Sequence, residues 1–171
     1  RDTLVLLEDE VYINPGEYKF ANFIGMVMTP ASKPFYLIIR NTMGRFFDGA
    51  RFSVYLEPTW NVSKHLEFGV TGNFDRLNFK SGNMSATNQI LGLKTVIMLS
   101  TSLSFSSYIQ YNTAVNEVLT NLKFRYNPRE GNDLYLVFNE GRNTYLDREN
   151  PRLPVYSSRS LLLKYTYTFS L

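Results

Sequence analysis

The chain has 171 residues, a formal net charge of +3 and no cysteine. Without cysteine there are no disulfides and no cysteine-ligated metal sites, and no apolar run is long enough for a transmembrane helix. Lysine and arginine form no continuous stripe, so nucleic acid is not an expected partner.

Alternation of apolar and polar residues, in which every second side chain lies on the same face, is the main pattern along the chain. It predicts about ten strands and no helix, all within a single domain that covers residues 1–171. The predicted strands are Leu4–Ile13, Glu17–Met28, Phe35–Phe46, Arg51–Val62, His65–Phe79, Gln89–Leu99, Ser102–Asn112, Val118–Asn127, Asp133–Asn139 and Ser160–Leu171.

The last predicted strand shows the alternation most clearly. From Leu161 to Leu171 every odd position is apolar or aromatic, and the even positions are polar except Leu162. A strand of about ten residues with one apolar face is long enough to cross a bilayer at a tilt. The same alternation recurs in several other segments, so we expect a sheet rather than an isolated strand.

The polar faces of these strands carry many charged side chains. A dry core could not hold so many charges without large desolvation costs, whereas the lumen of a membrane barrel could. We therefore expect an all-β fold, an antiparallel up-and-down transmembrane β-barrel or part of a larger one. The charges expected to face its lumen are Arg51, Glu57, Glu67, Asp75, Lys94, Lys123, Arg125 and Lys164.

The predicted connections alternate between two ends of the sheet. The two longest, Lys80–Asn88 and Arg142–Arg159, fall at the same end. Outer-membrane barrels have long loops outside and short turns on the periplasmic side. This asymmetry predicts the bacterial outer membrane as the location, with lipid and lipopolysaccharide as the surroundings.

Aromatic residues on the apolar faces are expected to form girdles at the two membrane interfaces. Phe52 and Trp60 are eight residues apart on one strand, roughly 20 Å along the membrane normal at about 3.3 Å per residue and a tilt of about 40°. This span approaches the apolar band of about 25 Å. The predicted girdle residues are Phe52, Trp60, Phe74, Tyr111, Tyr126 and Phe169.

The stretch from Gln110 to Gly141, with Phe124-Arg125-Tyr126-Asn127-Pro128-Arg129-Glu130-Gly131-Asn132-Asp133, resembles the C-terminal barrel of a bacterial family. This is domain-of-unknown-function family 5916, whose members carry an N-terminal domain similar to carbohydrate-binding module family 9. The resemblance implies a longer parent protein and a glycan ligand bound through that additional domain. The segment Asn127–Asp133, with Pro, Gly, Asn and Asp, is expected to reverse the chain, and a docking site for a periplasmic partner is its alternative role. Periplasmic or outer-membrane proteins are the expected protein partners. The resemblance implies no catalytic residues and no cofactor.

Two other functions remain open from the sequence. One is an outer-membrane hydrolase whose carboxylates lie near the outer rim, such as Asp75 with Asp48 or Glu140. The other is a soluble lipocalin-like binding barrel, whose polar strand faces would point outward. The single histidine, His65, is expected in a turn far from the outer rim, and the acidic run Glu8-Asp9-Glu10 lacks the spacing of a calcium loop. We therefore expect neither a catalytic residue nor a metal site.

Overall fold

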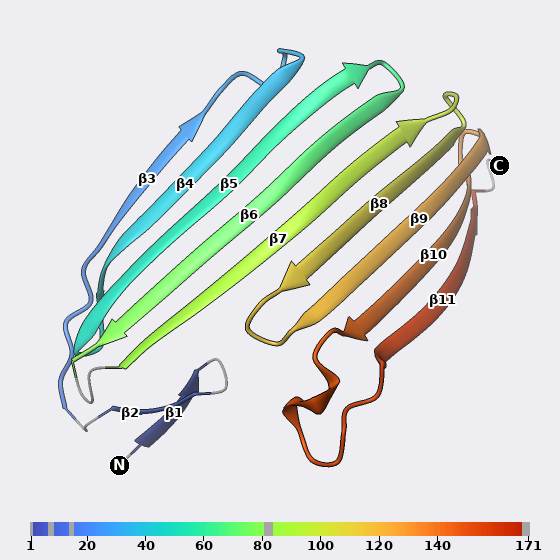
Figure 1. Cartoon of the computed structure of the whole chain (residues 1–171). Coiled ribbons are helices and arrows are strands. Elements are labelled where there is room, and N and C mark those ends of the chain that lie inside the picture. Colours follow the sequence, from blue (N-terminus) through green and yellow to red (C-terminus); the bar gives the residue numbers. More distant parts are fainter. Residues whose placement is uncertain (1, 7–8, 14–15, 81–83, 169–171) are drawn as a thin grey trace.

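A single curved sheet dominates the computed structural model, which describes residues 2–6, 9–13, 16–80 and 84–168 (Figure 1). The only helical element of the described chain is a 3-10 turn, Leu146–Arg148. No described helix is long and apolar enough to span a membrane. The nine strands of the sheet are β3 (Asn22–Met28), β4 (Phe35–Phe46), β5 (Gly49–Ser63), β6 (Leu66–Phe79), β7 (Met84–Met98), β8 (Leu103–Asn112), β9 (Glu117–Arg129), β10 (Asn132–Asn143) and β11 (Tyr156–Tyr167).

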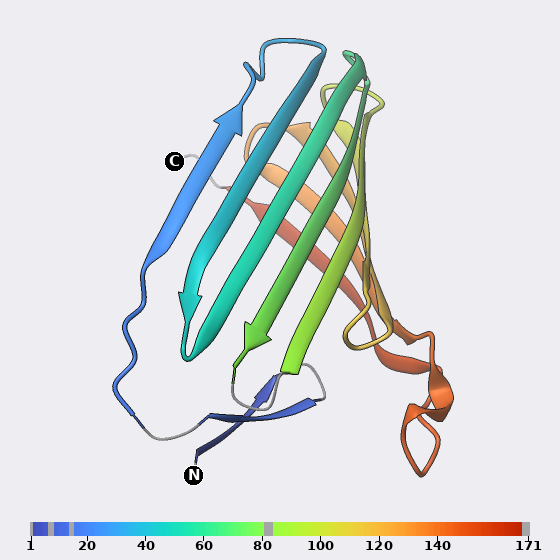
Figure 2. The same cartoon turned by 60° about the vertical axis from the view of Figure 1, so that its left-hand side comes forward.

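The strands follow one another in chain order, and each pairs antiparallel with the next. The predicted all-β, antiparallel up-and-down fold is confirmed. The sheet is not closed: β3 and β11 are its two edges, and Figure 2 shows the curved wall that the strands form. Consecutive hairpins need only short connections, so the meander follows directly from the alternation of strands and turns.

The N-terminal segment differs from the prediction. Leu4–Ile13 was expected to be one strand of the barrel, but it contributes to a separate hairpin of β1 (Asp2–Leu6) and β2 (Asp9–Ile13). The acidic run at residues 8–10 interrupts the apolar alternation there, and carboxylates in the middle of a membrane strand would be costly. The strand predicted from Glu17 begins only at Asn22.

The connections lie at two ends of the sheet, which we call the loop end and the turn end. The loop end carries the connections after β4, β6, β8 and β10, and the turn end carries those after β3, β5, β7 and β9. The loop predicted for Lys80–Asn88 is shorter, because β7 already begins at Met84. The longest described connection, residues 144–155, also belongs to the loop end and folds against the turn after β8, where the Thr144 N–H donates to Asn116 O at 2.8 Å.

The turn between β9 and β10 depends on one glycine. Gly131 has a φ of +81°, and a Cβ there would lie 2.8 Å from Thr168 Cβ. Its carbonyl accepts from the Thr168 N–H at 2.9 Å and so continues the ladder between β10 and β11. A glycine adopts this positive φ without strain, so Gly131 allows the chain to reverse between β9 and β10.

The sheet has almost no conventional core. Phe79 and Ala86 are the only hydrophobic side chains of the described chain that are buried, and both lie at the loop end. Tyr18, Phe46 and Phe47 pack around Phe79. Because a single layer cannot bury its own faces, the remaining apolar surface must be covered by something outside the described chain.

Candidate functional site

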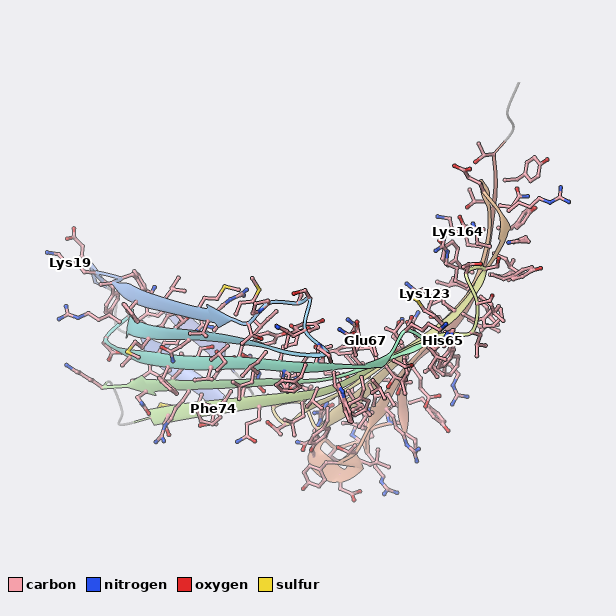
Figure 3. The ribbon with its side chains drawn as sticks, turned by 90° about the horizontal axis from the view of Figure 1, so that it is seen from above. Lys19, His65, Glu67, Phe74, Lys123 and Lys164 are labelled. Atoms are coloured by element: carbon pink, nitrogen blue, oxygen red, sulfur yellow. The ribbon has the colours of Figure 1, made fainter. Side chains whose placement is uncertain are left out.

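Strand register divides the side chains of the sheet between two faces, because directly opposite residues in paired strands point the same way. Figure 3 shows Glu67, Lys123 and Lys164 on the concave side and Phe74 on the opposite, convex side. Starting from these residues, the register assigns the remaining strand positions to one face or the other.

The convex face is apolar from β3 to β11. Many of its large side chains are between 40% and 72% exposed, far more than a sheet with a covering layer would allow. They include Phe23, Val27, Phe35, Leu56, Trp60, Val70, Leu91, Leu136, Leu161, Leu163 and Tyr165. A continuous apolar surface of this extent is typical of a face that meets lipid or another protein.

Polar side chains form the border of this apolar surface at the loop end. Arg76 and Gln89 follow the apolar residues of β6 and β7 on the convex face, and Glu140 and Arg159 do the same on β10 and β11. The Arg159 Nε donates to Glu140 Oε2 at 2.8 Å, and its guanidinium carbon lies 3.9 Å from the centre of the Tyr156 ring. The apolar band therefore ends before the longest strands do.

The predicted girdle residues that the structure describes all lie on the convex face. Trp60 is opposite Phe35 and Phe68 near the turn end, and Tyr126 is opposite Leu134 near that end. Phe52, Phe74 and Tyr111 lie nearer the loop end, and the Phe52 and Phe74 rings contact edge to face at 6.5 Å. Phe169 lies outside the described residues. Phe35 and Phe68 were missed, although the alternation in their strands places them on the same face as Trp60.

The eight predicted lumenal charges all lie on the concave face. On β5 and β6 they are Arg51, Glu57, Glu67 and Asp75, and on β7, β9 and β11 they are Lys94, Lys123, Arg125 and Lys164. The period of two alone placed them on one side of their own strands. The register between strands then brings those sides together.

Three ion pairs cross between strands of the concave face. Arg51 pairs with Asp75 at 3.1 Å, Lys94 with Glu67 at 3.0 Å, and Arg125 with Asp133 at 2.7 Å. Their side chains are between 20% and 44% exposed, so solvent screens the pairs and they balance charge more than they add stability. Asp133 was not among the predicted charges, because its partner is set by the turn between β9 and β10.

The remaining predicted charges have other surroundings. Glu57 accepts a hydrogen bond from the Tyr55 hydroxyl at 2.7 Å. Lys123 and Lys164 make no ion pair within the described chain. Among the described residues, five of the eight predicted charges therefore lie in ion pairs, and Glu57, Lys123 and Lys164 do not.

A polar hollow of about 440 Å³ lies on the concave face across β4 to β8. Hydrogen bonds link side chains within the hollow. The Asn73 amide donates to Asp75 at 2.5 Å, and the Tyr108 hydroxyl donates to Gln110 at 3.2 Å. The hollow is lined by Arg40, Thr42, Arg51, Ser53, Tyr55, Thr71, Asn73, Asp75, Ile90, Tyr108 and Gln110. Hydroxyls, amides and paired charges can solvate a polar solute or a column of water.

Arg40 is the main residue of this hollow that sequence reasoning missed. It faces Tyr55 across the β4–β5 pair and makes no ion pair within the described residues. The alternation of Phe35, Leu37 and Ile39 with the intervening positions of the same strand could have assigned Arg40 to the polar face.

One of the two carboxylate pairs considered for a hydrolase, Asp75 with Glu140, is divided between the two faces of the sheet. Asp75 lies on the concave face and Glu140 on the convex face, so these two carboxylates cannot act on one bond. His65 occupies the turn between β5 and β6, where its Nδ1 lies 2.7 Å from Met98 O. The described residues contain no group of three or more histidine, aspartate or glutamate side chains able to hold a metal ion.

Comparison of the chain with protein-family models, curated proteins and solved structures finds no match. The two faces of the sheet, with the side chains that line them, are therefore the features that bear on function.

Proposed function

We propose that this chain forms part of the wall of a bacterial outer-membrane β-barrel, with the convex face in contact with lipid and the concave face lining a polar interior. In this role the protein is a membrane anchor or a narrow conduit rather than an enzyme. The chain resembles barrels attached to carbohydrate-binding-like domains, which supports the further proposal that it is the membrane part of a glycan-handling protein.

The observation that carries this proposal is the opposite chemistry of the two faces. The convex face exposes Leu56, Trp60 and Leu163 at 42%, 53% and 72%, while the concave face holds ion pairs and hydrogen-bonded polar groups. In water, the apolar convex face would be exposed to solvent, while the charges would lie on the concave face. In a bilayer, the same arrangement satisfies both faces.

The single tryptophan, Trp60, offers a direct test of this proposal. The chain would be folded into phosphatidylcholine vesicles, with and without brominated acyl chains, and the tryptophan fluorescence recorded. We expect bromine to quench Trp60 and aqueous acrylamide to leave it largely unquenched, because the indole lies on the convex face.

A matched control moves the tryptophan to the other face of the same strand, with Trp60→Phe and Tyr55→Trp in one chain. Its fluorescence should respond to acrylamide and not to brominated lipid. If Trp60 responded to acrylamide while the control tryptophan responded to brominated lipid, the orientation proposed for the sheet would be wrong.

A further inference from the structure

The two edge strands of the sheet carry backbone groups that no described strand pairs. The Arg45 N–H donates to Ala21 O and the Thr29 N–H to Leu37 O, and bonded pairs alternate along an antiparallel ladder. The even residues of β3 from Asn22 to Met28 therefore direct their N–H and C=O groups away from β4.

β11, at the other edge of the sheet, also has backbone groups that no described strand pairs. The Thr168 N–H donates to Gly131 O, so the even residues of β11 are bonded to β10. The odd residues from Arg159 to Tyr167 then direct their backbone groups to the open side. Each unpaired backbone group costs several kcal/mol in hydrocarbon, so a bilayer does not tolerate two such edges.

The direction of the strands limits what can cover these edges. β3 and β11 are separated by an even number of hairpin reversals, so they run in the same direction. If they paired with each other, or with the same strands of a second copy in the same orientation, the new seam would be parallel. All eight pairings inside the sheet are antiparallel, and parallel pairing is slightly less stable per residue.

The side chains of β3 point to the same conclusion. Ile24, Met26 and Met28 face the concave side, yet they are apolar and between 53% and 66% exposed. The opposite side of the strand is also apolar, with Phe23 and Val27 exposed at 66% and 61%. A strand that is apolar on both faces is typical of one with neighbours on both faces and at its edge.

Resting on the proposed function, we infer that β3 and β11 are interior strands of a larger barrel, and that an odd number of further strands, from polypeptide outside residues 1–171, lies between them. These strands run antiparallel to both edges at the two seams. Next to β3 they present apolar side chains on both faces, and next to β11 they continue the apolar convex face.

The absence of cysteine allows a cross-linking test on residues 1–171 in phosphatidylcholine vesicles. A chain with Met26→Cys and Leu162→Cys would report, with a short thiol cross-linker, whether β3 approaches β11. A cross-link within one chain would show that the sheet closes on itself, and a cross-link between two chains would show pairing with a second copy. Either product would overturn the inference.

The available edge would then be probed with a synthetic peptide of the β4 sequence, Phe35–Phe46, carrying one added cysteine at either end. Reporter cysteines replace Asn22 or Met28, which lie about 20 Å apart at ~3.3 Å per residue. An antiparallel strand brings the peptide N-terminus to position 28 and its C-terminus to position 22. We expect about a tenfold preference for these two combinations, because the alternative ends are separated by nearly the whole strand.

The control is Ser53→Cys on β5, a strand whose two edges are both paired, and the peptide should not cross-link there. A preference for the reverse, parallel combinations, or no peptide cross-link at β3, would contradict the inference. Trp60 quenching by brominated lipid in the same vesicles tests the proposed membrane role separately from the inference of additional strands. A chain that inserts but closes on itself retains the proposed membrane role and loses the additional strands.

Discussion

Neighbouring residues on β9 have opposite environments, and this contrast can be tested by single substitutions. Phe124 lies on the convex face, directly opposite Phe105 and Leu136, whereas Lys123 lies on the concave face opposite Ser106 and Val137. The pleat of the strand separates the two side chains even though they are adjacent in the chain.

Phe124→Arg should destabilise the protein in a bilayer by up to about 2–4 kcal/mol if the site is near the midplane, and by less towards the interface. Lys123→Gln should change stability by no more than about 0.5 kcal/mol, because this lysine has no ion-pair partner in the described chain. Urea titration of the two variants in vesicles would measure the difference. Equal losses for the two variants would count against a lipid-facing Phe124.

Among the elements, the turn between β9 and β10 makes the sharpest prediction. Gly131→Ala should cost about 1–3 kcal/mol, since alanine would have to adopt the positive φ of Gly131 and its Cβ would meet Thr168. Gly25→Ala on β3 is the control, because the nearest side-chain atom to its added Cβ lies 3.6 Å away. Comparison of their unfolding midpoints would test the prediction, and similar midpoints would argue against strain at the turn.

The sequence predicts a strand well where apolar and polar residues alternate, and poorly where they do not. The alternation predicted β4 with its observed bounds, Phe35–Phe46, and assigned all eight charges to the polar sides of their strands. It missed the start of β7 at Met84, since the convex positions Ser85, Thr87 and Gln89 are polar there and produce no apolar alternation.

Contacts between strands could not be predicted from the alternation alone. Arg51 and Asp75 are 24 residues apart, and their meeting depends on the register of β5 against β6, which turn geometry and a register shift near Asn61 determine. The pairing of Arg125 with Asp133 depends in the same way on the shift between Asn132 and Leu134. The alternation along a strand determines which face a side chain lies on, whereas the register between strands determines which side chains it contacts.

At the scale of the whole molecule, a single layer with one apolar face has a direct consequence in water. Without detergent or lipid, we expect the chain to form assemblies larger than a monomer, because the convex face far exceeds the apolar patches tolerated on monomeric soluble proteins. Analytical ultracentrifugation in buffer, with and without detergent, would measure this. A folded monomer in plain buffer would instead support the lipocalin-like alternative.

The central claim is that the convex face meets lipid and the concave face meets water, and spin-label accessibility tests it most directly. Labels would be attached to single cysteines at positions 123, 124 and 125 of the chain folded in vesicles. We expect the label at 124 to relax with oxygen, which partitions into lipid, and the labels at 123 and 125 to relax with a water-soluble nickel chelate. A label at 124 that responds to the nickel chelate, with labels at 123 and 125 that respond to oxygen, would show that the wall faces the other way.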